Sequence, residues 1–338
     1  MEKIPSSGWS IMALLRFILA FIVVASHLNG FGEVTGGFKV VSDLGGKAAV
    51  LGFLLISGIS IGYSYFKSDE GFYKRRLLRV YPLYFAAVLF TLFVQFYVGS
   101  PFELHGMGLQ KAGTFTTVAN FLLLQEFITI PLPYNAVLWS LSIEVFFYLL
   151  TPLFARMNNL LLSALILVSI VVFAFTYTYW GFTIYGFPAV VYLWPWLTGF
   201  LLVKCKKPWP LLLIIPGLAA VYYNSTMIKE PLSAVAFAVT AIIVYLVCTY
   251  SVSIKAFKPV FDYLGEISYP LYLFHFPLLV LIYKFGISNF YISLLITFIM
   301  VAIFNYVFDH WLKKVFWVPF IDFLDRKYLA VRGLYYKN

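Results

Sequence analysis

The chain contains ten apolar segments of the length that can cross a lipid bilayer. A helix needs about 20 consecutive, mainly apolar residues to span the hydrocarbon core. The segments lie at 9–30, 44–66, 80–99, 136–155, 160–178, 188–203, 209–224, 231–250, 264–284 and 288–308. They predict an all-α polytopic membrane protein, a bundle of about ten transmembrane helices. An even number of spans puts both termini on the same side of the membrane.

The composition agrees with a membrane environment. Hydrophobic residues make up 62% of the chain and charged residues only 11%, whereas soluble domains are about 25% charged. A core of ordinary size cannot bury that many apolar side chains, so we expect lipid to surround most of the chain. The two cysteines, Cys205 and Cys248, are too few for a disulfide scaffold.

The distribution of lysine and arginine predicts the orientation. Of the 24 such residues, 18 lie in segments on the side of the N-terminus, five lie on the other side, and Arg16 lies within a span. Because cytoplasmic loops are rich in these residues, we expect cytoplasmic N- and C-termini in the cell inner (plasma) membrane. We divide the chain into a transmembrane domain, 1–312, and a basic cytoplasmic tail, 313–338. This asymmetry accounts for the net charge of +10 without a nucleic-acid partner.

The first apolar segment carries Arg16 and His27. A charged group inside hydrocarbon costs roughly 2.5–3.5 kcal/mol on insertion scales. The two residues are eleven positions apart, which is three helical turns plus about 20°, so they share one face about 16 Å apart. Snorkelling of the arginine and interfacial solvation of the histidine are alternatives. The shared face favours a polar stripe that points into the bundle.

Three arginines, Arg75, Arg76 and Arg79, precede the third apolar segment and share one helical face. Arginine binds phosphate through two parallel hydrogen bonds, and the start of a helix favours anions. The cluster predicts a site for a phosphorylated cytosolic ligand. The alternative interpretation is a plain topological signal.

Two further segments place polar groups within the membrane. Glu144 lies about eight residues into the fourth segment, roughly 12 Å deep, at a level comparable with His27. A carboxylate there needs a cation, an imidazole or water. In the ninth segment Tyr269, Tyr272 and His275 follow at spacings of three. A structural ion pair for Glu144 and an interhelical hydrogen bond for His275 are the simpler alternatives.

Five stretches together resemble the membrane acyltransferase-3 family. They are the Arg-ten residues-His pattern of the first helix, "FLLISGISIGYSYF", "FYKRRLLRVYP", "LWSLSIEVFFYLLTP" and "ISYPLYLFHFPLL". They occur in the family's order and cover almost the whole chain. Two departures stand out: Asp309 and His310 occupy the position where the family commonly has Glu before Pro, and only about thirty residues follow the last span. We therefore expect a stand-alone transferase.

The resemblance implies an integral membrane O-acyltransferase. It would move an acyl group, acetyl by family analogy, from cytosolic acyl-CoA to a hydroxyl of an extracytoplasmic cell-envelope glycan or glycolipid. In this interpretation His27 is the general base, and no metal is expected. The implied catalytic residues are His27, Arg16 and Glu144, the acyl-CoA-binding residues are Arg75, Arg76, Arg79 and Tyr81, and the acceptor-binding residues are Tyr272, His275 and Trp139.

A different class of protein fits some of the same residues. In a proton-coupled transporter or flippase of an envelope precursor, Arg16, His27 and Glu144 would form a proton relay. That alternative predicts no dependence on acyl-CoA. For a transferase, direct transfer and an acyl-histidine intermediate are both compatible with the sequence.

Overall fold

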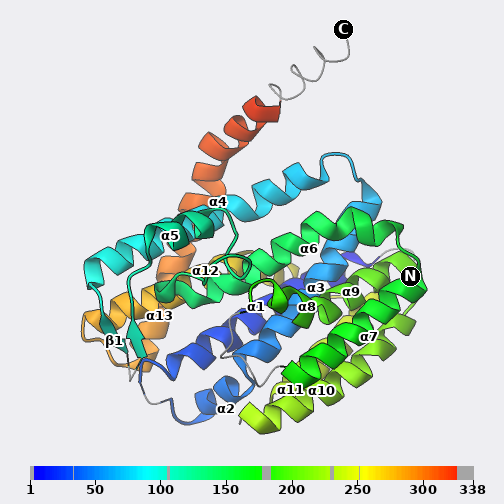
Figure 1. The fold of residues 1–338 in the computed structure, drawn as a ribbon, viewed down its shortest axis with the longest axis horizontal. Helices are drawn as coiled ribbons and strands as arrows, with labels where there is room; N and C mark the ends of the chain where they lie inside the picture. The colour runs from blue at the N-terminus through cyan, green and yellow to red at the C-terminus, as the bar shows by residue number, and fades with distance from the viewer. Residues whose placement is uncertain are drawn as a thin grey trace.

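The computed structural model describes residues 4–32, 34–104, 107–176, 184–228, 232–250 and 252–325. Within these residues the chain forms a bundle of helices with one short antiparallel hairpin, β1–β2 (Figure 1). The elements are α1 (Ser6–Leu28), α2 (Gly37–Asp43), α3 (Gly46–Lys67), α4 (Phe72–Val98), β1 (Phe102–Leu104), β2 (Met107–Leu109), α5 (Thr114–Phe121), η1 (Pro133–Leu138), α6 (Trp139–Arg156), α7 (Asn159–Thr176), α8 (Phe187–Val191), α9 (Leu193–Cys205), η3 (Trp209–Leu213), α10 (Ile214–Ile228), α11 (Ser233–Thr249), α12 (Lys258–Lys284), α13 (Phe290–Phe304) and η4 (Asn305–Trp317).

Each of the ten predicted apolar segments falls on helix in the described residues. Seven helices are long and apolar enough to cross a membrane by length and composition, and three shorter apolar helices cover the rest. The seven are Ser6–Leu28, Gly46–Lys67, Phe72–Val98, Pro133–Arg156, Asn159–Thr176, Lys258–Lys284 and Phe290–Asp325. The helical membrane-protein class is therefore confirmed, whereas the count of ten spans and the side of the termini stay predictions.

Two helix starts differ from the predicted segments. Helix α4 begins at Phe72, directly after Gly71, whose φ of +63° suits glycine. The arginine cluster therefore lies within the first turns of this helix. The fourth span begins with the short 3₁₀ helix η1, in which Tyr134 and Asn135 are fully buried. Its first residues thus lie inside the protein rather than at the membrane surface.

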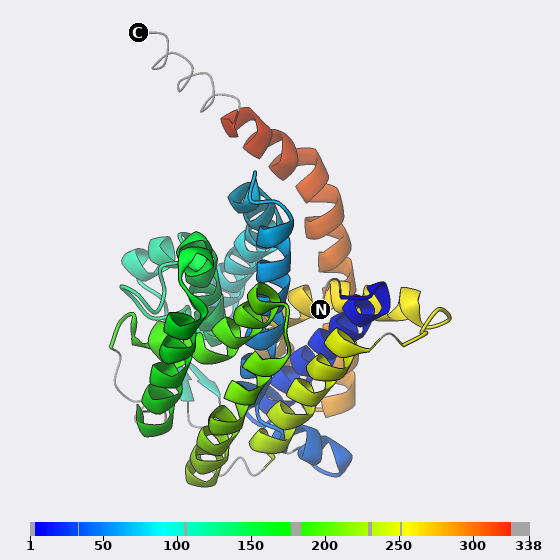
Figure 2. The ribbon, with the colours of Figure 1, turned by 90° about the vertical axis from the view of Figure 1, so that its right-hand side faces the viewer.

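The last helix continues well past the predicted end of the final span. Helix α13 runs into the π-helical segment η4, and the combined helix is described as far as Asp325. Figures 1 and 2 both show its end extending beyond the rest of the bundle. The start of the predicted tail is thus helical, and residues 326–338 lie outside the described residues.

Small residues bring the central helices close together. Helix α1 packs mainly on α12, and α3 mainly on α9. An added Cβ at Gly58 of α3 would lie 1.9 Å from the Trp196 carbonyl oxygen, and one at Gly265 of α12 would lie 2.3 Å from the Ala13 Cβ. In lipid, where hydrophobic contact favours no particular helix pair, such close backbone packing drives association.

Gly58→Ala should destabilise the bundle, because its methyl group would overlap the backbone of α9. Overpacking of this kind costs typically 1–3 kcal/mol. A thermal unfolding series on the purified protein in detergent measures the effect as a lower midpoint. Gly37→Ala is the matched control, since nothing lies within 4 Å of its Cβ position. Equal midpoints for the two variants would contradict the proposed close contact.

Candidate active site

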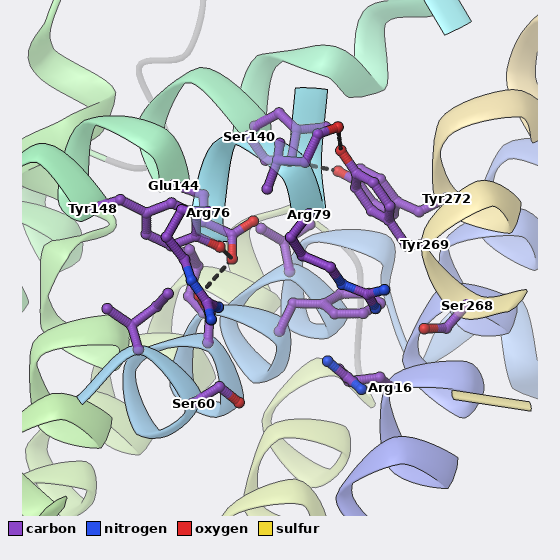
Figure 3. A pocket seen from close by; sticks show the side chains of 17 residues that line it. Arg16, Ser60, Arg76, Arg79, Ser140, Glu144, Tyr148, Ser268, Tyr269 and Tyr272 are labelled. Carbon is purple, nitrogen blue, oxygen red and sulfur yellow. Dashed lines mark hydrogen bonds between the residues drawn. The ribbon is translucent and has the colours of Figure 1, made fainter. Parts of the chain in front are cut away.

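A polar cavity of about 140 Å³ lies between α1, α3, α4, α6 and α12. Its polar lining comprises three arginines, one carboxylate, and serine and tyrosine hydroxyls (Figure 3). These residues are Arg16, Ser57, Ser60, Arg76, Arg79, Ser140, Glu144, Tyr148, Ser268, Tyr269 and Tyr272. Five helices that are distant in sequence thus place their polar side chains in one intramembrane space.

The side chains of Arg16, Arg76 and Arg79 line the same cavity, and Figure 3 shows them around one space. The Nη2 of Arg76 donates to Ser64 Oγ at 3.0 Å, and its guanidinium lies 5.9 Å from the Phe72 ring centroid. The Arg79 side chain is 41% exposed, which puts this residue at the mouth of the cavity.

The positive charge of this cavity is only partly balanced. Arg79 Nη1 lies 3.8 Å from Asp309 Oδ2, a weak pair that Asp309 shares with Lys313. Arg16 makes no ion pair within the described residues, and the Nε atoms of Arg16 and Arg76 are buried without a partner there. Because uncompensated charge is costly in a low-dielectric interior, the arrangement favours an anionic ligand.

Glu144 lies at the level of the arginines. Its Oε1 accepts hydrogen bonds from Ser57 Oγ and from Tyr148 Oη at 2.6 Å. Helix α3 runs antiparallel to α1, with Gly46 beside Ser26 near the end of α1. Ser57 therefore lies well down the bundle from His27. Glu144 therefore lies beside Arg16 and Arg76 rather than beside His27, and its depth in the membrane stays a prediction.

Three predicted site residues point elsewhere. Arg75 donates to the backbone carbonyls of Ser68 and Glu70 and so closes the loop before α4. Tyr81 Oη donates to the Phe121 carbonyl at 3.2 Å. Tyr81 lines a second, mainly apolar groove of about 490 Å³, which shares Arg76, Val80 and Tyr148 with the polar cavity. Trp139 packs on Tyr192, with ring centroids 4.8 Å apart. Within the described residues, none of the three lines the polar cavity.

His27 meets His275 rather than Glu144. The Nδ1 of His27 lies 3.1 Å from the Nε2 of His275, and the ring of His27 also contacts Phe276. Neither histidine lines the arginine cavity. His275 is fully buried, while His27 is partly exposed near the end of α1. The two histidines thus form a second polar site next to the first.

Tyr272 separates the two sites. Its hydroxyl lines the cavity, donates to the Val137 carbonyl at 3.1 Å, and lies 2.7 Å from Ser140 Oγ. Its ring centroid lies 6.2 Å from that of His275 and 5.6 Å from that of Phe53. The cavity therefore ends at Tyr272 and Phe53, and the histidine pair lies behind them.

Asn135 holds this part of the site together, and sequence reasoning missed it. Pro277 has no N–H, so the helix offers no donor to the Leu273 carbonyl four residues earlier. Asn135 Nδ2 donates to that carbonyl at 3.0 Å and to Thr91 Oγ1 at 2.9 Å. A proline in an apolar helix indicates that the carbonyl four residues earlier has no backbone N–H donor in the helix. Only the fold shows which side chain donates a hydrogen bond to that carbonyl instead.

The two residues that depart from the family pattern also have partners. His310 Nε2 contacts Glu266 Oε1, which also accepts from Asn305 Nδ2 at 2.7 Å. Asp309 pairs with Lys313 at 2.8 Å and lies next to Arg79. Asp309 therefore connects η4 to Arg79 at the cavity entrance, and His310 connects η4 to Glu266 of α12.

Comparison with known proteins decides the family. The family model of the acyltransferase-3 family, which describes an acyltransferase domain, matches residues 10–310. The chain belongs to the acyltransferase-3 family. It is 31% identical over 153 residues to acyltransferase MdmB of Streptomyces mycarofaciens, an alignment that covers 42% of this chain and 38% of that protein. The chain thus spans less than half of the length of that relative. No solved structure matches it significantly.

Family membership confirms the resemblance seen in the five sequence stretches. Acyl transfer by this chain, like the alternative of a transporter or flippase, stays a prediction. The arginine cavity and the histidine pair are therefore the candidate active site of this acyltransferase-3 protein. The roles of individual residues in that site stay predictions.

Asn135→Ala should destabilise the protein by about 1–3 kcal/mol, because it leaves the buried Leu273 carbonyl without a donor. The loss should be smaller in a Pro277→Ala background, where the restored backbone N–H can reach that carbonyl. Thermal midpoints of the wild type, both single variants and the double variant form the measurement. Strictly additive shifts would show that Asn135 acts through something other than this carbonyl.

Proposed function

We propose that this acyltransferase-3 protein is an O-acyltransferase that uses cytosolic acyl-CoA, with acetyl as the acyl group by family analogy. The acceptor is a hydroxyl of an extracytoplasmic cell-envelope glycan or glycolipid. The observation that carries this proposal is the group of three guanidinium side chains, Arg16, Arg76 and Arg79, around a cavity that holds one carboxylate. The family match supports acyl transfer as the reaction class.

The arginines suit a donor that carries phosphate groups. Arg79 is half-exposed at the cavity mouth, and Arg76 lies further in with its Nε unpartnered within the described residues. The phosphates of acyl-CoA would bind to these two residues, since guanidinium groups match phosphate oxygens bidentately. They would replace the 3.8 Å contact between Arg79 and Asp309. The thin pantetheine arm would enter the cavity of about 140 Å³, and the nucleotide would stay outside it.

Arg16 would act deeper along the same path. It lies on α1, on the face that α12 covers, and lines the inner cavity together with Ser268 and Tyr269. Its positive charge would stabilise negative charge of the donor along this path, since Arg16 lies about 16 Å from His27 along α1. Glu144 would hold the cavity wall through Ser57 and Tyr148, as its hydrogen bonds indicate.

His27 would be the general base. As the acceptor hydroxyl oxygen attacks the thioester carbonyl, the imidazole removes the hydroxyl proton and then protonates the departing CoA thiolate. The O–H and C–S bonds break while the new ester C–O bond and the thiol S–H bond form. The thioester must pass Tyr272 to reach this residue, because the cavity ends there.

The orientation of the protein is part of the proposal. The lysine and arginine distribution supports cytoplasmic termini in the inner (plasma) membrane. Helices α1 and α12 run in the same direction, with Ala13 beside Gly265 and His27 beside His275. Donor entry at the arginine end and acceptor entry at the histidine end then place the two substrates on opposite sides of the membrane.

The Arg76→Ala/Arg79→Ala variant should lose acyl-CoA binding. Charge-assisted hydrogen bonds contribute about 1.5–3 kcal/mol each, so the double variant should bind roughly 10²-fold more weakly or worse. Labelled acetyl-CoA and purified protein in detergent provide the measurement.

Arg75→Ala and Arg156→Ala are the matched comparisons for that measurement. Arg75 contacts loop carbonyls and Arg156 is exposed at the end of α6, so both variants should bind acyl-CoA as the wild type does. Equal loss in the double variant, in Arg75→Ala and in Arg156→Ala would point to a diffuse electrostatic effect. Absence of any acyl-CoA binding by the wild type would reject the proposed donor.

His27→Ala should lower acyl transfer by about 10²–10⁴-fold, the usual contribution of a general base. Acyl-CoA binding should stay near the wild-type value, because His27 does not line the arginine cavity. Acylation of envelope glycans in cells with wild-type and variant protein, combined with the binding measurement, separates the two effects. A variant that still acylates the acceptor at the wild-type rate would exclude this residue from the reaction.

A further inference from the structure

The contact between His27 and His275 bears on which nitrogen of each imidazole ring carries a hydrogen. The Nδ1 of His27 and the Nε2 of His275 are 3.1 Å apart, which is hydrogen-bonding distance. The ring centroids lie 5.2 Å apart with an interplanar angle of 36°. One proton therefore lies between the two nitrogen atoms, and the remaining contacts decide to which ring it belongs.

The contacts of the other ring nitrogen of His275, Nδ1, show which ring carries the shared hydrogen. Its Nδ1 lies 3.0 Å from the Leu271 carbonyl oxygen and 2.9 Å from the Tyr272 carbonyl oxygen, both on the preceding turn of α12. Carbonyl oxygens only accept hydrogen bonds, so the Nδ1 of His275 must carry a hydrogen. A neutral imidazole has one N–H, so the Nε2 of His275 presents a lone pair to His27.

The tautomer of His27 follows. With His275 as the acceptor, the Nδ1 of His27 is the donor and carries the hydrogen. The Nε2 of neutral His27 then has the free lone pair. We infer that His275 is a positioning residue, which holds His27 in the tautomer whose Nε2 accepts the proton of the acceptor hydroxyl. This inference rests on the proposed role of His27 as general base.

The surroundings of His275 suit a positioning residue and not a substrate contact. The side chain is fully buried, whereas His27 is partly exposed. Asn135 binds the carbonyl of Leu273, two residues before His275, and so fixes this part of α12. The sequence interpretation placed His275 on the acceptor; the geometry points to an indirect role, through His27.

Two substitutions separate this role from simple packing. In His275→Gln the side-chain carbonyl oxygen can accept from the Nδ1 of His27, as the imidazole does. In His275→Leu the volume is kept but no acceptor remains. We expect kcat for acyl transfer to fall about 10²-fold in His275→Leu and less than tenfold in His275→Gln, with the KM for acyl-CoA unchanged in both. Equal losses in the two variants would overturn the inference.

Nitrogen NMR tests the tautomer without reference to activity. The chain has only four histidines, so ¹⁵N-histidine labelling of the purified protein in lipid nanodiscs gives few signals, and His27→Gln assigns those of His27. Neutral His27 should show a protonated Nδ1 and a bare Nε2. In His275→Leu this preference should weaken, because the Val23 carbonyl then remains as the partner of His27, and in His275→Gln it should remain at the wild-type level.

The two measurements distinguish failure of this inference from failure of the proposed function. A wild-type His27 with its proton on Nε2 overturns the positioning role even when the protein transfers acyl groups. If His27 has the expected tautomer but the protein transfers no acyl group, the inferred histidine arrangement stands and the proposed reaction is rejected. Full activity of His275→Leu overturns the positioning role directly.

Discussion

The rest of the structure depends on the uncompensated positive charge inside the helix bundle. Arg16, Arg76 and Arg79 share one cavity with a single carboxylate, Glu144. Charged groups in a low-dielectric interior are stable only with partners or a polar surrounding. Serine and tyrosine hydroxyls from α3, α6 and α12 supply that surrounding, which requires these three helices to meet α1 and α4 closely at one level. The same excess of charge makes the cavity suited to an anionic ligand.

Close helix packing places a second polar site next to this cavity. Gly265 lets α12 approach Ala13 of α1, and further along the same pair of helices His275 meets His27. Pro277 interrupts the hydrogen bonding of α12 just after this histidine, and Asn135 of η1 replaces the missing donor. The irregular backbone therefore lies against protein rather than lipid, as a membrane environment demands.

The polar cavity and the histidine pair are two distinct sites in the described residues, with Tyr272 next to both. Tyr272 lines the cavity, and its ring centroid lies 6.2 Å from that of His275. The contact between Asp309 and Arg79 adds a counter-charge at the cavity entrance.

The sequence by itself determined the helical membrane class, the family and the polar face of the first helix. These follow from hydropathy and helical period, which are local properties of the chain. Only the tertiary structure decided which side chains meet. Arg75 lies among the arginines in sequence yet folds back to loop carbonyls, and Tyr81 faces a different groove. Glu144 lies among the arginines because α6 packs its side chain against Ser57 of α3, and His275 meets His27 because α1 and α12 run in the same direction. The rotation and register of each helix and the rotamers of long side chains depend on packing between distant segments. The spacing of residues within one segment therefore cannot predict them.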